Sequence, residues 1–132
     1  MKEIIMSLWL TLFGYSVATT RTTTTTYEDV RKAIIREFKE ECPIALGVFR
    51  SESGLRFSAV GDSGKSIGVA QIHIPSHKKK IPVENKTEWL MNFQNNIKLA
   101  KQIRDKSGWN AWTQYKNGAY KQFVDYSCLK EI

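Results

Sequence analysis

Between residues 30 and 38, apolar positions repeat every three to four residues, which is the spacing of one face of an α-helix. The members of this face are Val30, Ala33, Ile34 and Phe38. Thr26 and Asp29 stand just before them in the Ser/Thr-x-x-acid order that caps a helix start. The pattern predicts an amphipathic helix over 27–41.

A second helix is predicted from Pro43, because proline suits the first turn of a helix. Its apolar positions are Ala45, Val48 and Phe49, and the next position on the same face is Glu52. A carboxylate that continues an apolar stripe near a helix C-terminus is partly desolvated and meets the unfavourable end of the helix dipole. Both effects raise the pKa of Glu52. The alternative is a helix that ends one residue earlier and a Glu52 that faces water.

The remaining segments are shorter or more polar. A glycine-bearing polar stretch over 58–66 precedes alternating residues over 67–74, which read as a short strand or an extended loop. A long amphipathic helix is predicted over 87–106. The aromatic tail over 109–123 predicts two short helices separated by Gly118. The chain is therefore mainly α, of the α+β kind, with one short extended segment.

The N-terminus carries an uncharged apolar run over 4–17, followed by small residues that end at Ala18. This order is typical of a secretory signal peptide. As a helix the run would cover about 21 Å, less than the ~30 Å hydrocarbon core of a bilayer. We expect residues 1–18 to be cleaved and the protein to be exported to the periplasm, cell envelope or exterior. An uncleaved anchor and a buried helix are the alternatives. Residues 19–26 form a Thr-rich linker.

Charge adds a preference for an anionic partner. The 132 residues include 20 Lys and Arg against 13 Asp and Glu, a formal net charge of +7. With 42% apolar residues, 8 Gly and 3 Pro, the composition excludes a disordered, collagen-like or multidomain protein. The basic charge alone would allow a nucleic-acid binder, but a signal peptide argues against one. We expect no nucleic-acid partner and no stable membrane insertion after cleavage.

The chain has two cysteines, Cys42 and Cys128. Export would place both in an oxidising compartment, where a disulfide persists. A Cys42–Cys128 bridge is therefore predicted, with two free thiols as the alternative. No neighbouring motif supports a catalytic cysteine.

The two histidines, His73 and His77, lie four residues apart. Pro75 between them is expected to break the helix that would align them, and no third ligand is evident, so no metal site is predicted. Both histidines are expected to flank a cleft or the surface. The lysine run 78–80 is typical of a solvated loop; the alternative is that it attracts the carboxylates and phosphates of an anionic partner.

Four short motifs occur in an informative order: ES at 52–53, GVAQI at 68–72, NI at 96–97 and YKNG at 115–118. Together they resemble the soluble lytic transglycosylase domain of the lysozyme-like superfamily, and most closely its phage and secreted bacterial versions. The resemblance covers about residues 42–123.

The resemblance implies a small lysozyme-like fold over 27–132 that cuts the β-1,4 bond between N-acetylmuramic acid and N-acetylglucosamine in peptidoglycan. Glu52 takes the catalytic position: it would protonate the leaving oxygen and then deprotonate the muramic acid 6-hydroxyl, giving a 1,6-anhydro product. No metal or cofactor is implied. The expected partners are peptidoglycan glycan strands, and the chain is expected to act as a monomer, alone or attached to a secretion or phage assembly.

The resemblance also implies substrate-binding residues, namely Ser53, Gln71, Tyr115 and Asn117. Gln71 would line the cleft and bond to the sugar, and the Tyr115 hydroxyl would orient the acid. Asn96 is expected to hold its helix to the cleft wall rather than to contact substrate.

The sequence departs from the family pattern at several positions. Ala70 stands where the family usually has Met, so an apolar wall of the cleft is lost or filled from elsewhere. The extra Lys116 leaves open whether it or Asn117 faces the sugar. Ser66 holds the place of the second carboxylate of animal-type lysozymes, and the nearest acid, Asp62, lies in a Gly-Asp-Ser-Gly stretch typical of an exposed turn.

A single acid without a nucleophile favours a transglycosylase over a two-carboxylate hydrolase. A lysozyme-type muramidase, with Asp62 as second carboxylate, remains the runner-up. The third interpretation is a peptidoglycan-binding module that has lost activity.

Overall fold

The computed structural model describes residues 24–132, so the predicted signal peptide and linker residues 19–23 lie outside the described residues. The described chain is mainly helical, with a small three-stranded antiparallel sheet. The α-helices are α2 (Tyr27–Phe38), α3 (Cys42–Ser53), α4 (Ile74–His77), α5 (Lys86–Met91), α6 (Phe93–Ser107) and α7 (Thr113–Lys116). The strands are β1 (Val60–Gly61), β2 (Ser66–Ile67) and β3 (Ile72–His73).

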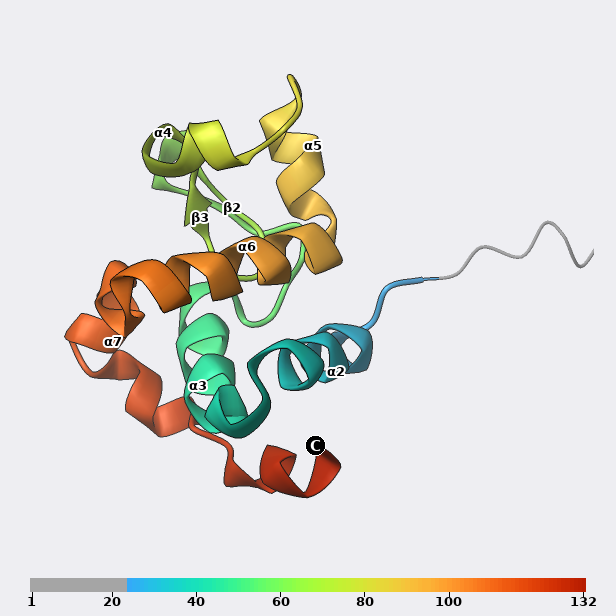
Figure 1. Cartoon of the computed structure of the whole chain (residues 1–132), viewed down its shortest axis with the longest axis vertical. Coiled ribbons are helices and arrows are strands. Elements are labelled where there is room, and N and C mark those ends of the chain that lie inside the picture. Colours follow the sequence, from blue (N-terminus) through green and yellow to red (C-terminus); the bar gives the residue numbers. More distant parts are fainter. Residues whose placement is uncertain (1–23) are drawn as a thin grey trace, which may run out of the picture.

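Short 3₁₀ helices link these elements and form the C-terminal tail. They are η2 (Lys39–Glu41), η3 (Asp62–Gly64), η4 (Lys78–Lys80), η5 (Trp109–Ala111), η6 (Ala119–Phe123) and η7 (Tyr126–Glu131). In Figure 1, α6 crosses the middle of the molecule. The sheet, α4 and α5 lie on one side of it, and α2, α3 and the tail lie on the other. No helix among residues 24–132 has both the length and the hydropathy of a membrane span.

The first two helices begin as predicted. The Thr26 hydroxyl accepts a hydrogen bond from the Asp29 N–H at 3.1 Å, and the Asp29 carboxylate accepts one from the Thr26 N–H at 2.8 Å. Pro43 lies in the first turn of α3. That helix ends at Ser53 because Gly54 takes a left-handed conformation, with φ +66°. Glu52 is therefore inside the last helical turn, and the alternative of an earlier helix end is excluded.

The segment 67–74 differs from the prediction. It is a hairpin of two short strands rather than one extended segment, with Ile67 opposite Ile72. The chain reverses because Gly68 and Gln71 adopt positive φ angles of +82° and +50°. The alternation of apolar and polar residues does not reveal such a reversal, because each strand is only two residues long.

The predicted helix over 87–106 is likewise two helices. Asn92 breaks it with an extended ψ of 115°, and its side chain accepts a hydrogen bond from the Asn95 N–H at 3.0 Å. An asparagine side chain can accept a hydrogen bond from a nearby backbone N–H, and this bond replaces the one that the N–H would make within a continuous helix. Gly108 follows the last residue of α6, as predicted. The tail has short helices on both sides of Gly118, mostly of 3₁₀ form.

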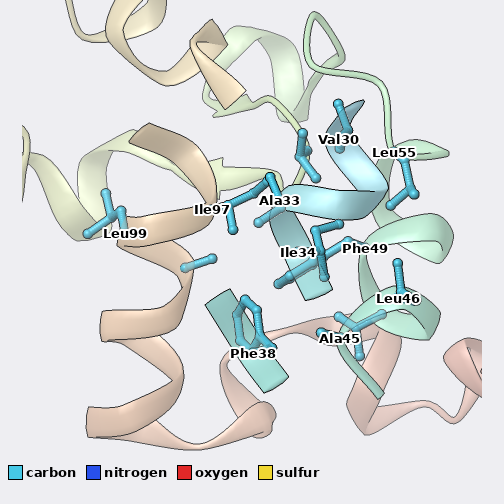
Figure 2. Packing of buried hydrophobic residues seen from close by; sticks show 14 of the residues in the cluster. Val30, Ala33, Ile34, Phe38, Ala45, Leu46, Phe49, Leu55, Ile97 and Leu99 are labelled. Atoms are coloured by element: carbon cyan, nitrogen blue, oxygen red, sulfur yellow. The ribbon is translucent and has the colours of Figure 1, made fainter. Parts of the chain in front are cut away.

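The core lies between α2, α3 and α6 (Figure 2). In that view Ile34 and Phe38 of α2 point toward Phe49 of α3 and the face of α6 that carries Ile97. An aromatic cluster extends this core toward the cleft described below, with ring centroids 5.4–6.0 Å apart. Its members are Phe38, Phe49, Trp109 and Trp112.

The C-terminal tail packs along α3 and is held there covalently. Cys42 at the start of α3 forms a disulfide with the buried Cys128 of η7, which confirms the predicted bridge and excludes the free thiols. Arg31 of α2 adds an ion pair to Glu131 at 2.7 Å. Gly47 permits this close packing, because a Cβ there would lie 2.9 Å from the carbonyl oxygen of Tyr120.

Residues 68–71 form a turn, buried at 68–70, whose backbone is satisfied partly by other backbone groups and partly by side chains. The Gly68 N–H donates to the Ala59 carbonyl at 2.7 Å. The fully buried Asn96 of α6 accepts a hydrogen bond from the Ala70 N–H at 2.9 Å. It donates to the carbonyls of Ile67 at 2.9 Å and Leu90 at 3.0 Å. Gly68 is required here, since a Cβ would collide with the Asn96 amide. Asn96 thus ties its helix to the hairpin, as predicted.

We predict that Asn96→Ala lowers the free energy of unfolding by about 3 kcal/mol, because it leaves buried backbone groups without partners. Urea denaturation measures this change. Gln94→Ala, an exposed position on the same helix, is the matched control and should change the value by less than about 0.5 kcal/mol. Equal effects of the two substitutions would contradict the anchoring role of Asn96.

We also predict that replacing both Cys42 and Cys128 by Ala lowers the free energy of unfolding by about 2–5 kcal/mol. The bridge spans 86 residues of sequence, and closing so long a loop restricts the unfolded chain strongly. Thermal melts with and without reductant provide the control, because reductant should lower the melting temperature of the wild type only.

Candidate functional site

A cleft of about 260 Å³ opens beside the C-terminal end of α3, facing the hairpin. Its wall combines the end of one helix, a turn, strand residues and the segment before α7. The lining residues are Glu52, Asp62, Ser66, Gln71, Ile72, His73, His77, Ile103, Ala111, Trp112 and Thr113. Residues within 52–77, Ile103 of α6 and residues 111–113 therefore contribute to one concave surface.

Glu52 is the half-buried acid of this cleft. Burial raises the pKa of its carboxyl above the ordinary value, because desolvation disfavours the charged form. A hydrogen bond from the backbone N–H of Gln114 works in the opposite direction by stabilising the carboxylate. The negative charge of Asp62 adds to the rise. Glu52 is thus an acid that keeps its proton to a higher pH than a solvated glutamate.

Asp62 occupies the exposed turn that the sequence predicted, with φ +50°. It also lines the cleft together with Glu52, which the turn motif did not reveal. The buried Ser66 hydroxyl donates a hydrogen bond to its carboxylate at 2.5 Å. The serine at the expected position of a second carboxylate therefore holds an aspartate from the neighbouring turn in the cleft.

Ser53 was predicted to contact substrate, but it is not among the residues that line the cleft. Its side chain is buried, 3% exposed, and its hydroxyl donates to the Val69 carbonyl at 2.6 Å. This bond ties the end of α3 to the buried turn. Ser53 therefore positions its neighbour Glu52 and does not present its hydroxyl to the cleft.

Gln71 does form part of the cleft wall. Its side-chain nitrogen donates to the carbonyls of Ala59 and Gly68, both at 3.1 Å. Both amide hydrogens are thus used within the protein. A ligand could reach only the side-chain oxygen, which lies against Gly61.

Tyr115 and Asn117 do not line the cleft. Tyr115 stacks on Tyr120 with ring centroids 4.7 Å apart, and Asn117 accepts a hydrogen bond from the Ala119 N–H at 2.8 Å. The helix period explains Tyr115: Thr113 of α7 lines the cleft, and a residue two positions later points about 200° away around the helix. The predicted role of the Tyr115 hydroxyl beside the acid does not fit this placement.

The apolar part of the wall comes from Ile72, Ile103 and Trp112. Ala70 is fully buried and contributes its backbone instead, since its carbonyl accepts a hydrogen bond from the Trp112 indole at 2.9 Å. The wall expected from the family's Met is therefore supplied by other elements.

Both histidines line the cleft, which was one of the two placements expected from the sequence. Pro75 lies in the first turn of α4, and His73 precedes that helix in β3, so no helix aligns the two histidines, as predicted. Burial lowers the pKa of His77, and the positive charges of Lys80 and His73 lower it further. Within residues 24–132 no group of three His, Cys, Asp or Glu side chains is arranged to hold a metal ion.

Sequence reasoning missed several contributors to the cleft, among them Ile103, Ala111, Thr113 and Gln114. Thr113 lines it and Gln114 donates its backbone N–H to Glu52. A backbone donor leaves no trace in residue identity, so no signal could have found it. Comparison with protein-family models, curated proteins and solved structures finds no match.

We predict that Asp62→Asn lowers the pKa of Glu52, because the substitution removes a negative charge that raises it. Carboxyl-carbon NMR titration of the folded protein measures this shift without any assay of activity. Asp105→Asn is the matched control, since Asp105 lies on α6, pairs with Lys101 and does not line the cleft. An unchanged Glu52 pKa in Asp62→Asn would mean that the two carboxylates do not interact.

Proposed function

We propose that this chain is an exported, lysozyme-like lytic transglycosylase that cleaves the β-1,4 bond between N-acetylmuramic acid and N-acetylglucosamine. The observation that carries this proposal is the half-buried Glu52, whose pKa is raised at the edge of a cleft. A carboxyl that keeps its proton to a higher pH than usual suits general-acid cleavage of a glycosidic bond. Glycan strands of peptidoglycan are the proposed partner.

In the first step, Glu52 donates its proton to the glycosidic oxygen as the bond from that oxygen to the anomeric carbon breaks. In the second, its carboxylate takes the proton of the muramic acid 6-hydroxyl as that oxygen bonds to the anomeric carbon. The products are a free 4-hydroxyl and a 1,6-anhydro sugar, and no water is consumed. The Gln114 N–H would stabilise the carboxylate between the two steps.

The motif resemblance supports the same proposal, because three of its four motifs meet at the buried turn. The ES pair at 52–53 bonds to this turn through Ser53, and the NI pair at 96–97 bonds to it through Asn96. The turn itself lies within the GVAQI segment at 68–72. Residues that define the motif pattern therefore support the geometry around Glu52.

Hydrolysis by a lysozyme-type muramidase is the second candidate, and the position of Asp62 favours it. Glycoside hydrolases use two carboxylates, one as acid and one as nucleophile or base. Asp62 lies in the same cleft as Glu52, held by Ser66. Such an enzyme would add water across the bond and leave reducing ends.

The test is mass spectrometry of soluble fragments released from purified peptidoglycan by residues 19–132. We expect 1,6-anhydro-muropeptides, and a loss of at least about 10²-fold in release for Glu52→Gln, the usual contribution of a positioned acid. Asp62→Asn should retain release with the same products. Fragments one water heavier that vanish in Asp62→Asn would establish the muramidase instead. No release by the wild type would favour a binding module without activity.

The Glu52→Gln variant should remain folded, because the raised pKa of Glu52 in the wild type opposes stability at neutral pH, and the substitution removes this effect. A glutamate with a raised pKa in the folded state contributes full stability below its unfolded pKa, and this contribution is lost as pH rises through the folded pKa. Glu52→Gln should therefore be at least as stable as the wild type at pH 7. Urea denaturation checks this, so that lost activity is not mistaken for unfolding.

A further inference from the structure

A second hollow, of about 300 Å³, adjoins the cleft. His77 lines both cavities, so the two share a wall at the end of α4. The hollow continues along η4, and apart from Pro75 its lining residues are polar or charged: Ser76, His77, Lys78, Lys79 and Lys80. The concave surface around Glu52 therefore extends past the histidines into a basic groove, defined here as residues 75–80.

The basic groove carries charge that the protein does not neutralise. Among residues 24–132, Lys78, Lys79 and Lys80 form no ion pair, whereas Lys101 and Arg104 are paired with acids. No Asp or Glu lines the groove. His77 remains neutral near pH 7, because its pKa is lowered. The groove is thus positive, while the adjoining cleft contains the carboxyls of Glu52 and Asp62.

This arrangement suits a ligand that is neutral where it meets the cleft and anionic a short distance away. A glycan strand of peptidoglycan has this form, since its sugars are uncharged and its muramic acid residues carry peptide stems with free carboxylates. We infer that the basic groove binds carboxylates of the peptide stem on a muramic acid seated in the cleft. The inference rests on the proposed function and names the part of the substrate that this site selects.

A tethered anion fits the groove better than a separate polymer. Ion pairs made by exposed lysines are individually weak and are screened by salt. A stem joined covalently to the bound sugar meets the lysines at a high effective concentration, so weak pairs suffice to hold it. A free phosphate polymer would depend on those weak pairs alone.

The experiment compares glycan strands that carry stems with strands from which an amidase has removed them, both free of phosphate polymers. The test variant combines Lys78→Gln, Lys79→Gln and Lys80→Gln. The control variant removes the same number of positive charges at exposed positions outside both cavities. Its substitutions are Lys106→Gln, Lys121→Gln and Lys130→Gln. We expect the test variant to raise KM for stem-bearing strands about fivefold at low salt, with kcat little changed.

The control variant should leave that KM unchanged, and neither variant should change KM for stem-free strands. High salt should abolish the difference. Equal losses on both kinds of strand, or in both variants, would overturn the inference and indicate a general charge effect. A third set of strands, which still carry phosphate polymers, completes the test. A loss seen only with that set would also overturn the inference, in favour of a polymer site.

Failure of the proposed function has a different signature, namely no cleavage of either strand by the wild type. Fluorescence anisotropy with labelled strands then decides the inference, since it measures binding alone. The inference stands if the test variant weakens binding of stem-bearing strands about fivefold and the control does not. It is wrong if the two variants bind alike.

Discussion

The structure depends on the burial of a turn, residues 68–71, inside a helical core. A buried backbone group without a partner costs about 1–3 kcal/mol, and backbone groups satisfy only part of this turn, such as the Gly68 N–H, which donates to the Ala59 carbonyl. Three side chains provide further partners: Asn96 of α6, Ser53 of α3 and Trp112 of the segment before α7. Any arrangement of the helices that failed to bring these side chains together would leave the turn unsatisfied. The turn thus fixes how α3, α6 and the segment before α7 meet.

The same bonds set the position of the cleft residues. Ser53 and Trp112 each bond to the turn, and each stands next to a cleft residue, Glu52 and Thr113 respectively. The buried turn is therefore bonded to Ser53, which is next to the cleft, and to Trp112, which lines it. Burial of Glu52 opposes folding at neutral pH, because it raises the pKa of a carboxyl. The disulfide contributes stability outside the cleft, and the aromatic cluster reaches the cleft wall only through Trp112.

Local signals predicted the helix boundaries that local chemistry controls. The cap at Thr26, the start of α3 at Pro43 and the end of α6 at Gly108 follow from single residues and their neighbours. The break at Asn92 was missed, because the apolar spacing continues through it while a side-chain hydrogen bond ends the helix. The reversal after Gly68 was missed because residue alternation records neither the positive φ of this glycine nor the close approach of the Asn96 amide, which leaves no room for a Cβ.

The sequence by itself determined that a glutamate at position 52 continues an apolar helical stripe, and hence that its carboxyl is partly desolvated. Periodicity along one helix is enough for that conclusion. Only the tertiary structure decided what faces Glu52. Asp62 reaches the cleft through a turn of positive φ, while Tyr115 points away around its helix. Which residues surround a site depends on how distant segments pack, and the burial of the 68–71 turn sets that packing.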